Sequence, residues 1–427
     1  MTTEKKVPRG RFDRITRLAT AGARVGASAL LGSDGSRTAK AASEVLGTLR
    51  GLATKVGQMA AYVDGVVPEA QRESYEKWMT GLLAAAPTSS PVAIRKLVEE
   101  ELGAPLGDLF SQWNDEPLAS ASIGQVHRAV MPDGRVVAVK VQHPGVAQAL
   151  ENDLKNAGLL EVVLATLGTR KFESKRILEE VRVRFREELD YRLEASRQKT
   201  FATIHAGDPT IRIPAIIDER SSRRVLTSDL VAGRSLDTAR GAEESVRRAW
   251  CETLWRFEYK AILIGGLFNA DPHPGNYFFQ DNGAIAFVDF GCVQPIFENR
   301  RPLAITVHHA AIARDEESFR RNIRELLELR GGAYEVRALR YVRQCFEPYF
   351  GSPFRVTRPY VASLVDDMKE LALVTRKQKD DQYVPMPEGM FFLNRLQFGF
   401  YSVLARLDAQ VDYAAVEKAF LPAGFMK

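Results

Sequence analysis

Two short polar motifs place the strongest constraint on how this chain can fold. The first runs from Asp271 to Asn276, and the second is Asp289-Phe290-Gly291, which ends a short apolar segment. In phosphoryl-transfer sites of this pattern, the first Asp accepts a proton from the acceptor, and the Asn and the last Asp hold Mg²⁺ on the ATP phosphates. A single Asp-Phe-Gly can be an unrelated turn after a strand. The two motifs in this order predict the metal- and phosphate-binding part of a kinase-type site.

The composition is that of an ordinary globular protein. The chain has 427 residues, of which 45% are hydrophobic and 26% charged, enough for two or three units with their own cores. Its three cysteines, Cys251, Cys292 and Cys345, are widely spaced, so neither a disulfide framework nor a zinc site is predicted. No long uncharged apolar segment or secretory signal is present, which favours a cytoplasmic protein without a transmembrane segment.

Charge is concentrated at the start of the chain. The net charge of +5 suits an anionic ligand or an anionic lipid surface, but it does not indicate nucleic-acid binding. Residues 1–36 are rich in Lys and Arg interleaved with apolar residues. This pattern predicts either a basic amphipathic helix that lies peripherally on a membrane or a solvated tail followed by a surface helix.

The remaining chain changes its periodicity twice. Residues 37–106 show helical spacing, 107–231 are rich in strands, and 232–427 are mostly helical, so we expect an α+β fold. In the middle part, Val126–Val130 and Val136–Val141 are strand-like runs joined by a Pro-Asp-Gly turn, which predicts a β-hairpin. Short strands are also expected at Tyr277–Phe279 and Ala284–Val288.

Lys140 ends a Val-Ala-Val-Lys strand, where a kinase places the lysine that binds the α- and β-phosphates. Taken alone, it is better explained as an exposed lysine at a strand edge, but Asp271, Asn276 and Asp289 downstream favour the phosphate-binding role. Acids that could orient Lys140 lie on the next helix, and the candidates are Glu187, Glu188, Asp190 and Glu194. Asp190 and Glu194 share a helix face, whereas Glu188 and Asp190 are about 200° apart on a straight helix. The latter two can act at one point only if the helix ends or bends between them.

The segment before the hairpin is the candidate phosphate-binding loop. Its backbone N–H groups can hold phosphate, although alanine and serine make it stiffer than a glycine-rich loop. The candidate residues are Ala119, Ser120, Ala121 and Ser122. No P-loop or dinucleotide fingerprint is present. Further upstream, Lys55 and Gln58 share a helix face, which by itself indicates only the polar side of a helix.

Six motifs in order resemble the UbiB/AarF atypical kinase family, also called the ubiquinone-biosynthesis kinase-like family. The resemblance covers residues 46–292, with a helical continuation to the end. The motifs are Lys-x-Gly-Gln at Lys55–Gln58, the Ala-rich loop Ala119–His127, Val-Ala-Val-Lys at Val137–Lys140, Glu188-Leu189-Asp190 with Glu194, the loop Ala270–Asn276, and Asp289-Phe290-Gly291.

The resemblance implies a bilobal, protein-kinase-like fold with an N-terminal helical extension over the nucleotide site. Residues 37–106 would form the extension, 107–231 the N-lobe and 232–427 the C-lobe. Lys55, with Gln58 beside it, would pair with Glu188 and Asp190 in a regulatory role, and Lys140 with Glu194. The cofactors would be ATP and Mg²⁺.

The same resemblance assigns the remaining site residues. Asp271 would position the nucleophile, Asn276 and Asp289 would bind the metal, and Asp229 and Val231 would lie at the adenine hinge. The extension would block protein substrates, so members look more like ATPases or small-molecule kinases that support isoprenoid-quinone or lipid-linked metabolism. Quinone-pathway lipids or proteins are therefore expected partners.

Three departures from the family pattern are visible. Asn269 stands two residues before Asp271, where the family usually has His. The hinge has Ser228-Asp229 in place of Met-Glu, which bears on nucleotide preference. The chain also lacks the apolar C-terminal tail of some bacterial members, so membrane contact would be peripheral.

Two other functions compete with an ATPase. One is a nucleotide-gated scaffold or lipid chaperone with little turnover. The other is a small-molecule kinase of the aminoglycoside or choline type, whose catalytic loop is similar, although the Lys-x-Gly-Gln motif and the Ala-rich loop oppose it.

Overall fold

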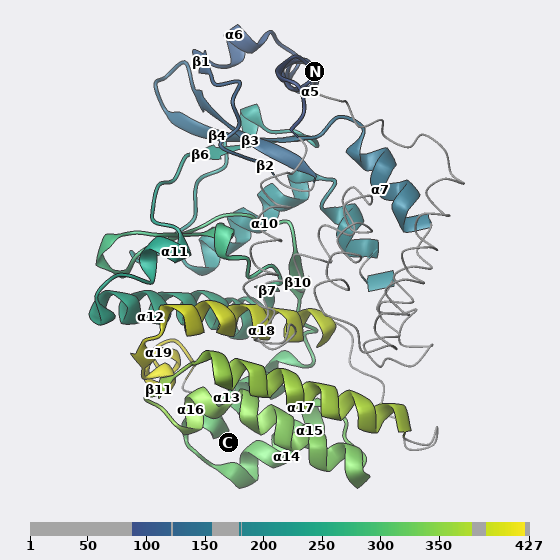
Figure 1. Cartoon of the computed structure of the whole chain (residues 1–427), viewed down its shortest axis with the longest axis vertical. Coiled ribbons are helices and arrows are strands. Elements are labelled where there is room, and N and C mark those ends of the chain that lie inside the picture. The colour runs from purple at the N-terminus through teal and green to yellow at the C-terminus, as the bar shows by residue number, and fades with distance from the viewer. Residues whose placement is uncertain (1–87, 121–122, 156–178, 181, 378–389, 423–427) are drawn as a thin grey trace, which may run out of the picture.

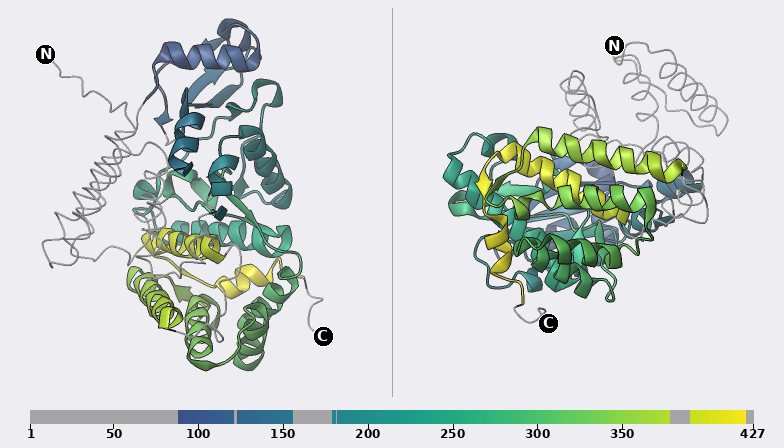
Figure 2. Two further views of the ribbon diagram at one scale, coloured as in Figure 1. Left: turned by 90° about the vertical axis from the view of Figure 1, so that its right-hand side faces the viewer. Right: turned by 90° about the horizontal axis from the view of Figure 1, so that it is seen from below.

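The computed structural model of the chain describes residues 88–120, 123–155, 179–180, 182–377 and 390–422. It has a small β-rich lobe at one end and a larger helical lobe at the other (Figure 1). The left view in Figure 2, turned by 90° about the vertical axis, shows the same division. Four of the predicted site residues, Lys55, Gln58, Ala121 and Ser122, lie outside the described residues, as does the basic segment 1–36.

The N-lobe is built on an antiparallel sheet in which β1, β3, β4 and β6 are neighbours in that order and β2 also pairs with β3. The strands are β1 (Gln112–Trp113), β2 (Ala119–Ser120), β3 (Gly124–Val130), β4 (Val136–Gln142) and β6 (Val225–Asp229). Strands β3 and β4 form the predicted hairpin, with Val130 opposite Val136. Helices α5 (Pro91–Leu102) and α6 (Leu106–Leu109) pack on the sheet.

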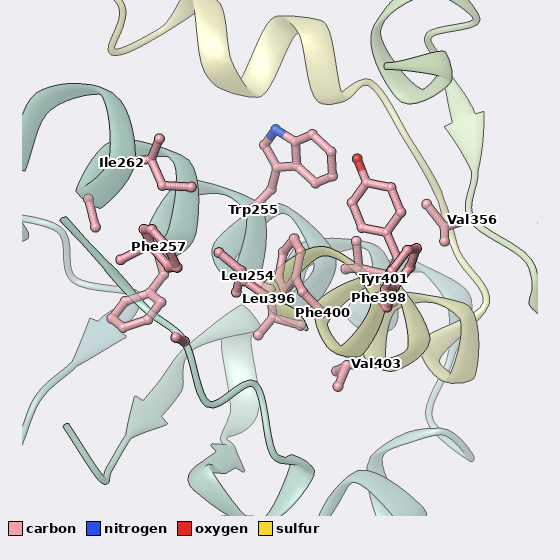
Figure 3. Close-up of a cluster of buried hydrophobic side chains, with 14 of the residues drawn as sticks. Leu254, Trp255, Phe257, Ile262, Val356, Leu396, Phe398, Phe400, Tyr401 and Val403 are labelled. Carbon is pink, nitrogen blue, oxygen red and sulfur yellow. The ribbon is translucent and has the colours of Figure 1, made fainter. Parts of the chain in front are cut away.

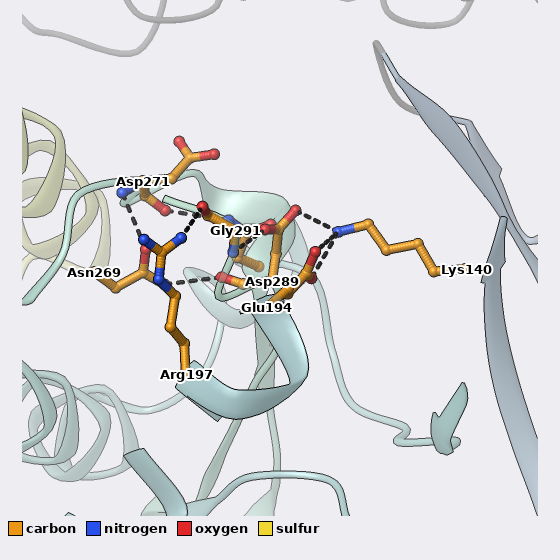
Figure 4. A network of polar contacts seen from close by, with 8 residues as sticks. Lys140, Glu194, Arg197, Asn269, Asp271, Asp289 and Gly291 are labelled. Carbon is orange, nitrogen blue, oxygen red and sulfur yellow. Dashed lines mark hydrogen bonds and ion pairs between the residues drawn. The ribbon is translucent and has the colours of Figure 1, made fainter. Parts of the chain in front are cut away.

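Alternation along β4 divides its side chains between two faces. Val137, Val139 and Val141 are fully buried in a core shared with α5. Lys140 therefore faces away from this core, toward the other lobe (Figure 4).

The helical segment that links the lobes is interrupted where the acidic motif lies. Residues 182–187 are helical, residues 188–190 are not, and α10 (Tyr191–Ile204) then begins. Asp190 caps α10, because its side chain accepts a hydrogen bond from Arg192 N. Glu188 and Asp190 therefore do not lie on one straight helix, and the separation of about 200° expected on such a helix does not apply to them. Helix α7 (Val146–Lys155) and the short η1 (Asp218–Arg220) complete this part.

The upper C-lobe carries short strands beneath the cleft. The elements are α11 (Leu236–Ala239), α12 (Glu244–Lys260), η2 (Ala261–Gly265), β7 (Leu267–Asn269), η3 (Pro274–Asn276), β8 (Tyr277–Phe279), η4 (Asp281–Gly283), β9 (Ile285–Phe287) and β10 (Val293–Pro295). Strand β9 pairs antiparallel with β8 and parallel with β5 (Ile211–Arg212), while β7 pairs antiparallel with β10. The strands expected at Tyr277–Phe279 and Ala284–Val288 are thus present, the second in shortened form.

Helices form the rest of the C-lobe. They are α13 (Arg301–Ile312), α14 (Glu316–Leu326), α15 (Gly332–Cys345), α16 (Glu347–Phe350), α17 (Arg358–Lys377), α18 (Met390–Leu407) and α19 (Tyr413–Lys418), with β11 (Phe354–Arg355) paired to β12 (Gln410–Val411).

Aromatic side chains fill the space between α12 and α18 (Figure 3). Trp255 of α12 is fully buried, and its ring centroid lies 4.2 Å from that of Tyr413 and 5.9 Å from that of Tyr401. Such rings bury large apolar areas, so this contact fixes α18 directly beneath the strands of the cleft. Across the described ranges, no helix has the length and apolar character needed to cross a bilayer.

Candidate active site

Lys140 is the centre of a charged cluster between the lobes (Figure 4). Its Nζ donates to both carboxylate oxygens of Glu194, at 2.7 and 3.0 Å, and lies 3.3 Å from Asp289 Oδ2. The ring centroid of Tyr191 lies 5.2 Å from the same nitrogen, within the range of a cation–π contact. The structure thus brings together a strand lysine, a helix acid and the Asp of Asp-Phe-Gly from three distant parts of the chain.

The two carboxylates determine the charge of Lys140. Burial by itself would lower the pKa of this amine, but the negative charges of Asp289 and Glu194 outweigh burial and hold the pKa well above its usual value. Lys140 is therefore a permanent cation, as a phosphate-binding group must be.

Asp289 is held in an unusual backbone conformation. Its φ is +65°, in the left-handed region that side chains other than those of Gly, Asn and Asp rarely occupy. Gly291 N donates to Asp289 Oδ1 at 3.1 Å, which stabilises the turn. Phe290 is fully buried, with its ring centroid 4.9 Å from that of Phe201 on α10. The buried ring anchors the turn, so the carboxylate before it points into the cleft.

Asn269 connects the catalytic loop to this turn. Its Nδ2 donates to the Asp289 carbonyl at 2.9 Å, and its Oδ1 accepts from Asp271 N at 3.2 Å. Asn276 Nδ2 donates to the Asp271 carbonyl at 3.1 Å. Asn269, which stands where the family usually has His, thus forms hydrogen bonds with both motifs. Unlike His, it has no ionisable ring.

Asp271 has a partner that the sequence did not suggest. Arg395 of α18 donates from Nη2 to Asp271 Oδ1 at 2.7 Å, and the side chains of the two residues are only 10% and 18% exposed. Burial would lower the pKa of Arg395, but Asp271 opposes this and the pKa is raised overall. Arg395 lies 124 residues after Asp271 and sits in an ordinary helical pattern, so no local signal marks it.

A second arginine clamp holds the backbone after Asp289, and it too was missed. Arg197 of α10 donates to the Gly291 carbonyl at 2.9 Å and pairs with Glu187. Glu187 also pairs with Arg184 at 2.7 Å, and Arg184 donates to the Val293 carbonyl at 3.1 Å. Helix α10 therefore supports the Asp-Phe-Gly turn through side chains other than Glu194.

The two proposed partners of Lys55 occupy different environments. Glu188 is buried, at 5% exposure, close to the cleft, where its Cγ comes near Gly291. Asp190 instead accepts from Arg192 Nη2 at 2.7 Å as well as capping α10. Lys55 and Gln58 lie outside the described residues, so their pairing with these acids stays a prediction.

The described part of the predicted phosphate loop and the predicted hinge belong to the N-lobe sheet or follow it directly. Ala119 and Ser120 form β2, next to β3, while Asp229 ends β6 opposite Val137, and Val231 follows it. Gly124 lies where the sheet meets α10, because a Cβ atom there would come within 2.6 Å of both the Tyr191 hydroxyl and the Val141 carbonyl. A glycine is required at this contact, so the start of β3 sits directly over Tyr191.

The polar groups of the cleft suit Mg²⁺ bound together with phosphates. The Asn276 amide nitrogen is engaged by the Asp271 carbonyl, which leaves its oxygen to act as a ligand, and Asp289 supplies a partly exposed carboxylate. The described residues contain no cluster of three or more acidic, His or Cys side chains able to enclose a metal. Mg²⁺ in nucleotide sites is commonly held by one or two protein oxygens together with substrate phosphates and water.

Fold and site together define a kinase-like protein, with a strand lysine above a helical lobe that carries the Asp271–Asn276 and Asp289-Phe290-Gly291 motifs. The sequence profile of the ABC1 atypical kinase-like domain matches residues 81–323. The chain belongs to the ABC1 atypical kinase family, the UbiB/AarF group that its motifs resemble.

Three relatives illustrate this membership. The chain is 28% identical over 372 residues to "Atypical kinase COQ8B, mitochondrial" of Rattus norvegicus, covering 86% of this chain and 69% of the rat protein. It is 32% identical over 283 residues to "AarF domain-containing protein kinase 1" of Xenopus laevis, covering 64% of this chain and 52% of that protein. A Mycobacterium tuberculosis protein solved as the Rv3197–erythromycin complex superposes with a TM-score of 0.62 at 28% identity, over 90% of this chain and 95% of the other.

Proposed function

We propose that this protein binds Mg²⁺-ATP between its lobes and hydrolyses it, as an atypical kinase-like ATPase. The observation that carries the proposal is the position of Lys140, held 2.7 Å from Glu194 and 3.3 Å from Asp289. A fixed cation beside a metal-binding carboxylate is the arrangement that stabilises a transferring phosphoryl group.

Each residue has a separate task in this proposal. Lys140 binds phosphate oxygens, Glu194 orients Lys140, and Asp271 positions the attacking water or hydroxyl group. Asn276 and Asp289 would hold the metal, which when bound neutralises charge on the phosphates. The backbone around Ala119, Ser120, Ala121 and Ser122 would cover the phosphates, and the hinge at Asp229 and Val231 would receive the adenine.

Nucleotide binding is tested by thermal unfolding of the full chain with Mg²⁺ and ATP. We expect the nucleotide to raise the Tm of the wild type, because a ligand that binds only the folded state stabilises it. Asp289→Asn should abolish the shift, while Asp366→Asn, at an exposed site on α17 in the C-lobe, should keep it. An undiminished shift in Asp289→Asn would contradict the metal assignment.

Hydrolysis must be separated from a scaffold that holds nucleotide with little turnover. The contact between Arg395 and Asp271 favours this second candidate, because it occupies one oxygen of the catalytic carboxylate. Release of inorganic phosphate by the wild type, reduced about 100-fold or more in Asp271→Asn, would support the ATPase. Equal release by both proteins would instead point to a contaminant and favour the scaffold.

The setting of the reaction rests on the relatives. The COQ8B name and the family resemblance support a role in isoprenoid-quinone or other lipid-linked metabolism at a membrane surface, with or without transfer to an acceptor. Phosphate release measured with and without anionic liposomes, for the full chain and for a chain lacking residues 1–36, tests the membrane part. If liposomes leave both rates of phosphate release unchanged, the basic segment 1–36 has no membrane role.

A further inference from the structure

The C-lobe contains a cavity of about 250 Å³ behind the strands of the catalytic loop. Its wall is mainly apolar and is contributed by α12, η2, β7, β10, α13, α14, α15, α17 and α18. Phe268, next to Asn269, forms part of it, and Leu393 and Leu396 of α18 form another part. Exposed Phe297, at 44%, lies on the rim, so the cavity has a side that reaches solvent.

One polar group in this wall is out of place. Glu258 of α12 is only 1% exposed, and neither of its carboxyl oxygens has a hydrogen-bond partner within the described residues. Burial raises the pKa of this carboxyl well above its usual range. A buried polar group without a partner is costly, and native proteins rarely keep one without a reason such as a bound molecule.

Other polar side chains of the wall differ from Glu258 because they are engaged. His308 Nδ1 lies 2.7 Å from Glu417 Oε1, and the Tyr349 hydroxyl donates to the other Glu417 oxygen at 2.5 Å. The Tyr341 hydroxyl donates to Asn394 Oδ1 at 3.0 Å. The wall is therefore a fixed polar and aromatic frame around an apolar space, and Glu258, which lines that space, has a carboxyl group without a partner among the described residues.

We propose that this cavity binds a small, largely apolar molecule that carries one oxygen able to accept a hydrogen bond from Glu258. A neutral carboxyl group donates one hydrogen bond, and a carbonyl or hydroxyl oxygen accepts it. The volume exceeds the roughly 150 Å³ of an apolar cavity that holds benzene, so it admits a bicyclic molecule. The lining of the cavity includes none of Lys140, Glu194, Asp271 and Asp289, so the site is separate from the proposed nucleotide site.

The probes 1-indanone and indane test the proposal because they have nearly the same shape and differ in one carbonyl oxygen. Isothermal titration calorimetry of each probe with the full chain should show saturable binding with one site. The wild type should bind 1-indanone more tightly by roughly three- to tenfold, the ratio that one hydrogen bond supplies. Glu258→Leu should remove this preference and still bind indane.

Two variants locate the binding. Ala338→Trp adds a large side chain from α15, where Ala338 lines the cavity, and should abolish binding of both probes. Ala304→Phe, a smaller addition from α13, should weaken it and serves if the first variant does not fold, as judged by circular dichroism. Absence of saturable binding, equal affinity of the two probes in the wild type, or undiminished binding in folded cavity-filling variants would overturn the proposal.

Discussion

Glu194 in the cleft and Glu258 in the C-lobe are both buried carboxyl groups, at 4% and 1% exposure, yet they are in different situations. Burial raises the pKa of both, but for Glu194 the positive charge of Lys140 opposes the rise. The comparison teaches that burial makes ionisation of a carboxyl group unfavourable in both places. A neighbouring cation determines how far this unfavourable free energy is offset. Lys140 favours the charged form of Glu194 against burial, although the pKa of Glu194 is still raised overall, whereas burial of Glu258 favours its neutral form without such opposition.

The largest effect should come from breaking the paired region. Lys140→Met leaves Glu194 and Asp289 close together without their cation, so we expect a loss of about 3 kcal/mol in the free energy of unfolding. Nucleotide-induced stabilisation should disappear as well. Urea denaturation with and without Mg²⁺-ATP measures both quantities.

A double variant separates the two consequences of that change. Lys140→Met with Glu194→Gln removes one of the stranded charges, so most of the lost stability should return while nucleotide binding stays absent. If the double variant is no more stable than Lys140→Met, the pairing of Lys140 with Glu194 is not what offsets the burial of these charges.

An intermediate effect is expected at Arg395, which stands between the two regions. Removal of its charge in Arg395→Met should lower phosphate release about tenfold or more, because a buried cation near the transferring group is lost. Arg395→Lys should restore part of the rate. A faster rate in Arg395→Met would mean instead that the contact restrains Asp271.

The effect that depends most on pH is expected at Glu258. Its pKa is raised in the folded state, so its carboxyl adds most to stability below the unfolded pKa of about 4.3 and less as the pH rises. Glu258→Gln is always neutral. Relative to the wild type, it should therefore gain stability with increasing pH, by at most about 1.4 kcal/mol per pH unit.

Unfolding free energies at pH 4 and pH 7 measure this gain. Glu252→Gln, on the same helix but partly exposed, controls for the loss of one carboxylate. A constant difference between Glu258→Gln and the wild type across this range would show that Glu258 is ionised in the fold and has a partner there.

The parts of this architecture that sequence could predict are those with local or motif-level signals. The hairpin that carries Lys140, the strands around Asp289 and the placement of Glu194 near Lys140 follow from periodicity or from the family resemblance. For Glu188 and Asp190, the sequence indicated only that the helix must end or bend between them if both residues act at one point.

The remaining features depend on contacts between distant segments. Arg395 carries no local signal, since an arginine on a helix is usually solvated. The Arg184–Glu187–Arg197 clamp requires the relative placement of two helical segments. The cavity that Glu258 lines is enclosed by side chains from elements throughout the C-lobe. Because these elements are far apart in the sequence, no pattern along the chain predicts the cavity.

The catalytic loop depends on contacts with helix α18, which is synthesised much later. Gly399 packs so closely on Pro272 that a Cβ atom would come within 2.5 Å of that ring, and Arg395 pairs with Asp271 from the same helix. The chain is synthesised from its N-terminus. The N-lobe and the Asp-Phe-Gly segment therefore emerge from the ribosome long before these residues. Asp271 therefore gains its contact with Arg395 only after α18, which begins at Met390, has been synthesised.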